Sequence, residues 1–74
     1  MSTRRKRTRR DSPHPSAAEI AAARAAASLT QTQAAELIYS TLRTWQDWEA
    51  GIAKMHPAIF ELFRIKTGQT RRAA

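Results

Sequence analysis

The sequence predicts an all-α fold: a compact domain of four or five helices that follows a disordered basic N-terminal arm. Three observations favour this class. Helix-start signals recur along the chain, alanine and apolar residues follow them at helical spacing, and no stretch alternates polar and apolar residues as a strand does. A chain of 74 residues holds one small domain. We expect the arm over 1–15, the domain over 16–68 and a frayed tail over 69–74.

Helix-start signals define the first two helices. Alanine, the best helix former, dominates the segment that follows Ser16, and apolar residues recur on one side of the segment that follows Thr30. Two capping boxes, in which a Ser or Thr is followed three residues later by Glu or Gln, predict helices over about 17–27 and 31–38. The pairs are Ser16 with Glu19 and Thr30 with Gln33.

Two further helices complete the domain. A turn at Tyr39-Ser40 precedes a third helix over about 41–50, capped by Thr41 or Ser40, and Gly51 suits its C-terminal end. Pro57 suits the first position of a fourth helix. Its apolar face is formed by Ile59, Phe60, Leu62 and Phe63, and Gly68 ends it.

The positive charge lies mainly at the ends of the chain. The net charge is +7, with thirteen lysines and arginines. From 11 to 68 there are five basic and six acidic residues, which leaves a net charge of −1. A block of like charges that cannot pack is typical of a disordered arm that binds polyanions. The residues expected to contact phosphates are Arg4, Arg5, Lys6, Arg7, Arg9 and Arg10.

The third helix has two chemically different faces. Trp45 and Trp48 are three residues apart, share one face and are assigned to the core. Arg43 and Gln46 lie on the outer side, and these side chains can form paired hydrogen bonds with guanine or adenine. Two short helices with such a second member have the layout of a helix-turn-helix DNA reader.

The segment 29–51 resembles the Cro/CI-like (XRE) helix-turn-helix family without a gap, and the similarity extends over about 16–67. The matching residues are Leu29, Thr30, Gln31, Ala35, Thr44, Trp45, Glu49 and Gly51. With the basic tail, TWQDWEAG and MHPAIFELFRIKTG, the chain is also similar to the small phage and mobile-element regulators that accompany anti-CRISPR genes. The resemblance implies a repressor of its own operon that binds double-stranded DNA at a palindromic operator as a homodimer.

The resemblance also implies roles for individual residues. The expected base readers are Thr41, Leu42, Arg43, Gln46 and Asp47. Leu42 would contact a thymine methyl group, and Asp47 either accepts from cytosine or pairs with Arg43, the alternative we favour. Gln31 would contact a phosphate and brace the third helix. The other expected phosphate contacts in the domain are Tyr39, Ser40, Thr44, Lys54 and His56. Bracing of the fold is the alternative for Thr44, and capping of the fourth helix is the alternative for His56.

Two departures from the family pattern affect these expectations. Tyr39 stands where the family commonly has glycine at positive φ, so the turn either differs or is strained. The chain also ends after the fourth helix, whereas many family members use a fifth helix to dimerise. Ile59, Phe60 and Phe63 are the candidate dimer surface, although core burial is the expected role of at least two of them.

Other chemistry finds little support. There is no cysteine, and His14 and His56 are far apart, so we expect no metal. No nucleophile–base pair or glycine-rich phosphate loop indicates an enzyme, a cofactor or a small-molecule substrate. No apolar run suits a membrane span or a signal peptide, so we expect a cytoplasmic, nucleoid-associated protein of a bacterial host cell. The alternative functions are an RNA-binding factor that uses the arm and an antitoxin-like protein-interaction module.

Overall fold

The computed structural model describes residues 14–69 and folds this part of the chain into four α-helices with no strand. They are α2 (Ala17–Ala26), α3 (Gln31–Leu37), α4 (Leu42–Ala50) and α5 (Pro57–Lys66). The all-α prediction is confirmed, and the expected bounds differ from these by no more than one residue. The expectations for the basic arm, Arg4 to Arg10, and for 70–74 lie outside the described residues.

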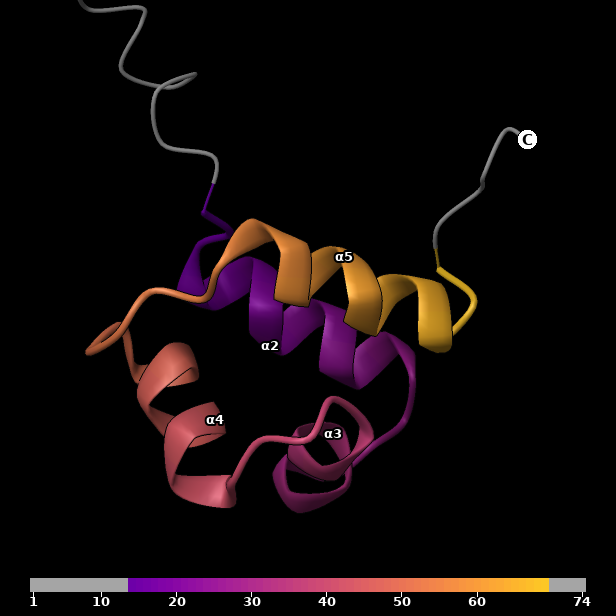
Figure 1. Ribbon diagram of the computed structural model, residues 1–74, viewed down its shortest axis with the longest axis horizontal. Coiled ribbons are helices and arrows are strands. Elements are labelled where there is room, and N and C mark those ends of the chain that lie inside the picture. The colour runs from indigo at the N-terminus through magenta and orange to yellow at the C-terminus, as the bar shows by residue number, and fades with distance from the viewer. Residues whose placement is uncertain (1–13, 70–74) are drawn as a thin grey trace, which may run out of the picture.

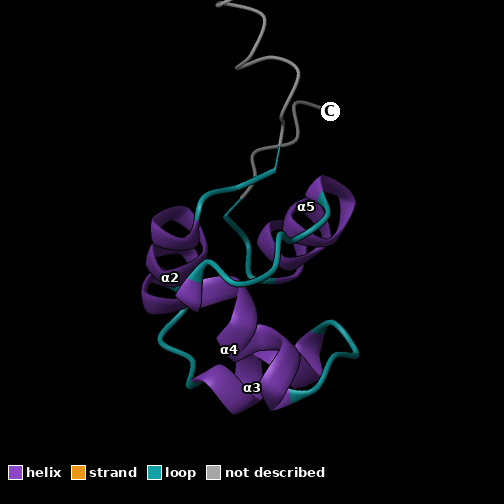
Figure 2. Cartoon of the chain, turned by 90° about the vertical axis from the view of Figure 1, so that its left-hand side faces the viewer, coloured by secondary structure: helices purple, strands orange, loops and turns teal. Residues whose placement is uncertain are grey.

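The four helices form two pairs at different levels of the domain. α2 and α5 lie across the upper part in Figure 1, with α3 and α4 below them. Seen from the side in Figure 2, α2 and α5 stand on opposite sides above α3 and α4. The N-terminal end of α4 is at the lower edge of the domain, away from α5 (Figure 1).

Local sequence explains where the helices begin. Both predicted capping boxes form, with the Ser16 hydroxyl accepting from the Glu19 amide at 3.0 Å and the Thr30 hydroxyl accepting from the Gln33 amide at 3.1 Å. Thr41 begins α4 in the same way, accepting from the Thr44 amide at 3.2 Å. The His56 imidazole caps α5 by accepting from the Ala58 amide at 3.0 Å, a cap that leaves Pro57 at the first position of the helix.

A residue with left-handed backbone conformation follows each of α2, α3 and α4, and two of these residues are not glycine. Gly51 ends α4 at φ 79°, as predicted. Ser28 follows α2 at φ 59°, and Tyr39 follows α3 at φ 61°. The Ser40 amide donates back to the Ala35 carbonyl at 2.8 Å, which closes the turn around Tyr39. The turn therefore keeps the shape that glycine favours, and the tyrosine carries the strain.

The core is centred on α4. Trp45 is fully buried, Trp48 is 8% exposed, and their ring centroids lie 5.6 Å apart with the rings edge to face. Phe63 of α5 packs on Trp45 at 5.1 Å between centroids. The assignment of both tryptophans to the core is confirmed. The other buried residues are Ile20, Ala23, Ala34, Ala35, Ile38, Met55 and Phe63.

One residue of the predicted dimer surface is misplaced. Phe63 has no exposed area, because its ring fills the space between α5 and Trp45. Its expected contact with a second copy is therefore wrong, since core packing uses the whole ring. Ile59 and Phe60 are partly buried and pack against the same core, in line with the expected burial of at least two of the three.

Candidate nucleic-acid interface

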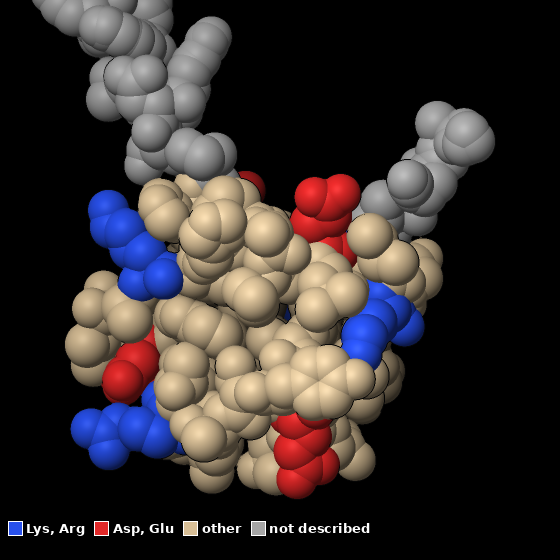
Figure 3. Space-filling model, in the orientation of Figure 1, with Lys and Arg blue, Asp and Glu red and all other residues tan. Residues whose placement is uncertain are grey.

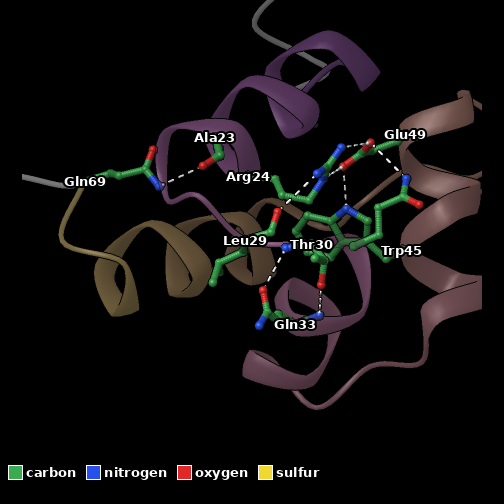
Figure 4. Close-up of polar contacts among 9 residues, drawn as sticks. Ala23, Arg24, Leu29, Thr30, Gln33, Trp45, Glu49 and Gln69 are labelled. Carbon is green, nitrogen blue, oxygen red and sulfur yellow. Dashed lines mark hydrogen bonds and ion pairs between the residues drawn. The ribbon is translucent and has the colours of Figure 1, made fainter.

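The inner face of α4 is fixed by one carboxylate that three helices share. Glu49 lies in the last turn of α4, and its side chain is only 10% exposed. It accepts from Arg24 of α2 at 2.6 and 3.0 Å and from the Trp45 indole at 2.5 Å (Figure 4). Gln31 of α3 donates to the same carboxylate at 3.1 Å. The guanidinium binds both carboxylate oxygens, a geometry that fixes direction as well as distance.

The other side of the guanidinium extends this network. The third guanidinium nitrogen of Arg24, Nη1, donates to the Leu29 carbonyl at 3.1 Å, in the link between α2 and α3 (Figure 4). No buried side-chain nitrogen or oxygen in the described part of the chain lacks a hydrogen-bond partner. The network therefore sets the position of α4 against α2 and α3 without leaving an orphaned polar group.

The electrostatics of this pair favour its charged form. The hydrogen bonds from Arg24 lower the pKa of the Glu49 carboxyl below its ordinary value of 4.5, with smaller contributions from Trp45 and Gln31, against the opposing effect of burial. The same contact raises the pKa of Arg24. Both groups remain ionised throughout the neutral pH range, so the brace is present whenever the domain is folded there.

The outer face of α4 differs from the inner face. Leu42 is 40% exposed, and Arg43 and Gln46 are also exposed. Arg43 contacts Asp47 at 3.4 Å between Nε and Oδ1, and the arginine side chain is 81% exposed. The expected pairing is present, but a long, exposed contact of this kind contributes only about 0.3–0.5 kcal/mol. Arg43 can therefore leave Asp47 for another partner at little cost.

The predicted base readers gather at one end of α4. Thr41, Leu42 and Arg43 form its exposed N-terminal end, and Gln46 follows one turn later. Thr41 has a structural task as the cap of α4, and its hydroxyl also donates to the Thr44 hydroxyl at 3.0 Å. The surface offers a guanidinium, an amide and an apolar side chain within two turns, which is a chemistry that base edges in a major groove can match.

The predicted phosphate contacts are more scattered. Gln31 braces α4 as expected, through Glu49, which occupies one end of its amide. Tyr39 is 84% exposed at the turn, and Lys54 is exposed in the loop after α4. Ser40 and Thr44 are half-buried, and His56 is exposed while it caps α5. Their contacts with phosphate stay predictions.

Sequence reasoning did not find two of the residues that shape this surface. The family pattern marks Glu49 only as a match at the end of α4, because its partners on other helices, Gln31 and Arg24, are 18 and 25 residues away. Lys66 of α5 donates to the Leu37 carbonyl at 3.1 Å and lies 4.6 Å from the centre of the Tyr39 ring. No local pattern indicates either contact, since each joins helices that are distant in sequence.

Charged side chains surround the face of the domain that carries α5, and they leave its centre uncharged. In Figure 3, blue and red side chains lie around the edge, and the middle, over α5 and the surface below it, is tan. Within 14–69, no group of three or more histidine, cysteine or acidic side chains is placed to hold a metal ion. None of the described helices has the length and apolarity that crossing a membrane requires.

Comparison with known proteins yields a partial match. No family model matches the chain. Over 38 residues, 51% of its length, the chain is 47% identical to the type II methyltransferase M.MspI of Moraxella sp.. The match covers 9% of the methyltransferase, so the chain is similar to a small portion of that protein.

Proposed function

We propose that the chain is a sequence-specific DNA-binding repressor, which reads the major groove with the N-terminal half of α4. The observation that supports this most directly is the contrast between the two faces of α4. Its inner face is held by Trp45, Trp48 and the Glu49 network, and its outer face presents Arg43 and Gln46. A reading helix needs a fixed backbone beneath side chains that are available to bases.

Two other observations agree with this proposal. The all-α fold of four helices and the short turn at Tyr39 suit the helix-turn-helix layout. The partial match, to a small portion of the type II methyltransferase M.MspI, is compatible with it. The proposal includes a homodimer on a palindromic operator upstream of its own gene, in the cytoplasm of a bacterial cell, and extends to the phage or mobile-element regulators that accompany anti-CRISPR genes.

The basic arm has a different task in this proposal. Six basic residues between Arg4 and Arg10 neutralise phosphates, which strengthens binding to any duplex without adding sequence information. Deleting 1–10 is therefore expected to reduce the salt dependence of binding by about 0.9 in slope for each lost contact. The ratio of cognate to random affinity is expected to change less.

The test is footprinting on the DNA immediately upstream of the gene, with random duplex and structured RNA as competitors. Symmetric protection that random duplex and RNA displace only at high excess would support the proposal. Preferential displacement by structured RNA would instead favour an RNA-binding factor. Equal affinity for upstream and random DNA would contradict sequence-specific reading by α4.

A further inference from the structure

A hollow of about 250 Å³ lies between the start of α2 and the loop after α4. Its walls come from the residues that join the arm to α2, and from the C-terminal end of α4 with the loop that follows. The lining residues are 14–17, Trp48, Gly51, Ala53 and Lys54. His14 ties the two walls together, because its Nδ1 donates to the Met55 carbonyl at 2.9 Å. We call this space the α2–α4 hollow.

Trp48 brings an unpaired hydrogen-bond donor to the α2–α4 hollow. Its side chain is nearly buried, with 8% exposed. The Trp45 indole donates to Glu49, whereas the Trp48 indole N–H has no acceptor among the contacts within 14–69. Every fully buried side-chain nitrogen in this part of the chain has a partner, so the Trp48 nitrogen must reach the surface. The hollow is a place where Trp48 does so, and a buried indole normally finds a partner.

The other polar groups of the α2–α4 hollow are mainly donors as well. Lys54 is exposed, and its ammonium forms no ion pair within the described part of the chain. The Ser16 hydroxyl accepts from the Glu19 amide, which leaves its own proton free to donate. The Ala17 amide is in the first turn of α2 and has no acceptor within the helix. The Glu19 carboxylate accepts from the Ser16 amide and is not among the lining residues, so no acidic side chain opposes an anion there.

We propose that the α2–α4 hollow binds a small phosphate monoester. The Lys54 ammonium and the start of α2 favour the negative charge, and the Trp48 indole supplies a directed donor. The three oxygens of a phosphate use these donors more fully than the two oxygens of a carboxylate do. Pro15, Ala53 and the Trp48 ring offer apolar contacts to the ester group. The ligand is small, because sites for drug-sized molecules have volumes of about 300–1,000 Å³.

The position of the α2–α4 hollow favours a free phosphate ester over a phosphate of the DNA backbone. The hollow adjoins the C-terminal end of α4. The proposed base readers Thr41, Leu42 and Arg43 are at the other end, which forms the lower edge of the domain in Figure 1. A helix of nine residues separates these two places by about 14 Å. A duplex that α4 reads with its N-terminal end therefore leaves the hollow available to another ligand.

A bound ester is expected to reduce binding to DNA through Lys54. This consequence rests on the proposed function, in which Lys54 is a predicted phosphate contact. The ester would withdraw this ammonium from the duplex and add negative charge beside the base of the arm, so the affinity for any duplex should fall several-fold. The ratio of cognate to random affinity should change little, since phosphate contacts carry no sequence information.

A titration of the ¹⁵N-labelled full chain with phenyl phosphate at fixed ionic strength tests the site. The Trp48 indole N–H resonance is expected to shift saturably. The Trp45 indole is the internal control, because Glu49 already accepts its proton and it should not move. Inorganic phosphate should shift the same Trp48 resonance at higher concentration, since it lacks the apolar group. Equal shifts of the two indoles, or the same Trp48 shift with sodium chloride, would overturn the proposal.

Substitutions identify the groups that hold the ester. Lys54→Gln is expected to weaken phenyl phosphate binding by up to about fivefold, in line with an exposed ion pair. Lys66→Gln is the matched control, because Lys66 is an exposed lysine that contacts Leu37 and Tyr39 on another part of the domain. Equal affinities of the two variants would overturn the proposal.

Trp48→Phe removes the indole donor and is expected to weaken binding of the ester by about tenfold. An unchanged Trp45 indole resonance shows that this variant is folded, since that resonance reports the hydrogen bond to Glu49. A folded Trp48→Phe chain with wild-type affinity for phenyl phosphate would contradict the role of the indole. If the variant does not fold, Lys54→Gln decides the outcome.

Binding to duplex DNA separates this proposal from the proposed function. If both hold, phenyl phosphate weakens duplex binding by the wild type and has little effect on Lys54→Gln. A saturable Trp48 shift without any cognate DNA binding contradicts the repressor and keeps the site. Cognate DNA binding without a Trp48 shift on addition of phenyl phosphate contradicts the site and keeps the repressor. A duplex that itself produces the phenyl phosphate shift would assign the α2–α4 hollow to the DNA backbone and overturn the free ligand.

Discussion

The two faces of α4 have different roles, because the inner face holds the helix in the domain and the outer face is available for binding. The inner face has Trp45 with no exposed area and Glu49 with four hydrogen bonds from three helices. The outer face has Arg43 with one contact of 3.4 Å. Substitutions on the inner face should therefore change the stability of the domain, and substitutions on the outer face should change only what it binds.

The largest expected effect is at the centre of the inner face. Trp45→Ala removes a ring that packs on both Trp48 and Phe63, and such truncations cost about 3–5 kcal/mol. A domain of this size has a total stability of only a few kcal/mol, so we expect the variant to be largely unfolded by circular dichroism. Trp45→Phe is the matched control, because it keeps most of the packing and loses the indole hydrogen bond to Glu49. A folded Trp45→Ala domain would contradict this division.

The next effect is at the shared carboxylate. Glu49→Gln keeps the shape of the side chain but leaves the Arg24 guanidinium without its counter-charge, so we expect a loss of about 2–4 kcal/mol in the free energy of unfolding. Glu36→Gln, at an exposed position of α3, is the control and should change stability by less than about 0.5 kcal/mol. Chemical denaturation measures both. Equal stabilities would mean that the tryptophans alone hold α4.

The same carboxylate predicts a dependence on pH. Because the folded pKa of Glu49 lies below its ordinary value of 4.5, ionised Glu49 stabilises the domain above that value. This contribution is lost as the pH falls from about 4.5 toward the lower, folded pKa, where the carboxyl takes up a proton in both states. Denaturation curves of wild type and Glu49→Gln should therefore converge over this acidic range. Curves that stay parallel would exclude Glu49 as the source.

Local and distant interactions explain how far the sequence predicted this arrangement. The capping boxes at Ser16 and Thr30 act within four residues, so their spacing alone predicted where α2 and α3 begin. The period of the tryptophans likewise predicted the buried face of α4. The bonds from Arg24 and Gln31 to Glu49 depend on how helices pack, and no spacing within one helix indicates them. Packing also decides that Phe63 is the residue of the predicted apolar face that is fully buried.

On the outer face, the expected change is in binding rather than stability. Arg43→Ala should cost roughly 1–3 kcal/mol in affinity for the cognate site and much less on random DNA, if the guanidinium reads a base edge. Arg43→Lys keeps the charge but loses the paired hydrogen bonds. This variant should therefore retain its affinity for random DNA and lose its preference for the cognate site. Fluorescence anisotropy with both duplexes measures this, beside unchanged melting temperatures. Equal losses of affinity for the cognate and the random duplex would mean that Arg43 contacts a phosphate and does not read a base.

The smallest effect concerns the two strained turns beside the brace. Ser28 and Tyr39 both hold positive φ without being glycine. Ser28→Gly should stabilise the domain by about 0.5 kcal/mol, because relief of the left-handed strain exceeds the entropy that glycine adds to the unfolded chain. Tyr39→Gly gains similar relief but loses the Lys66 contact, which is worth about 0.5–1 kcal/mol, so its net effect should be near zero.

A double-mutant cycle with Lys66→Met separates the two contributions at Tyr39. Once the ammonium is gone, Tyr39→Gly has only strain to relieve and should become stabilising, as Ser28→Gly is in either background. Lys66 also donates to the Leu37 carbonyl, but this loss is common to both arms of the cycle and cancels. If Tyr39→Gly has the same effect with and without Lys66, the cation does not support the tyrosine. The ring would then be held outward by the turn alone.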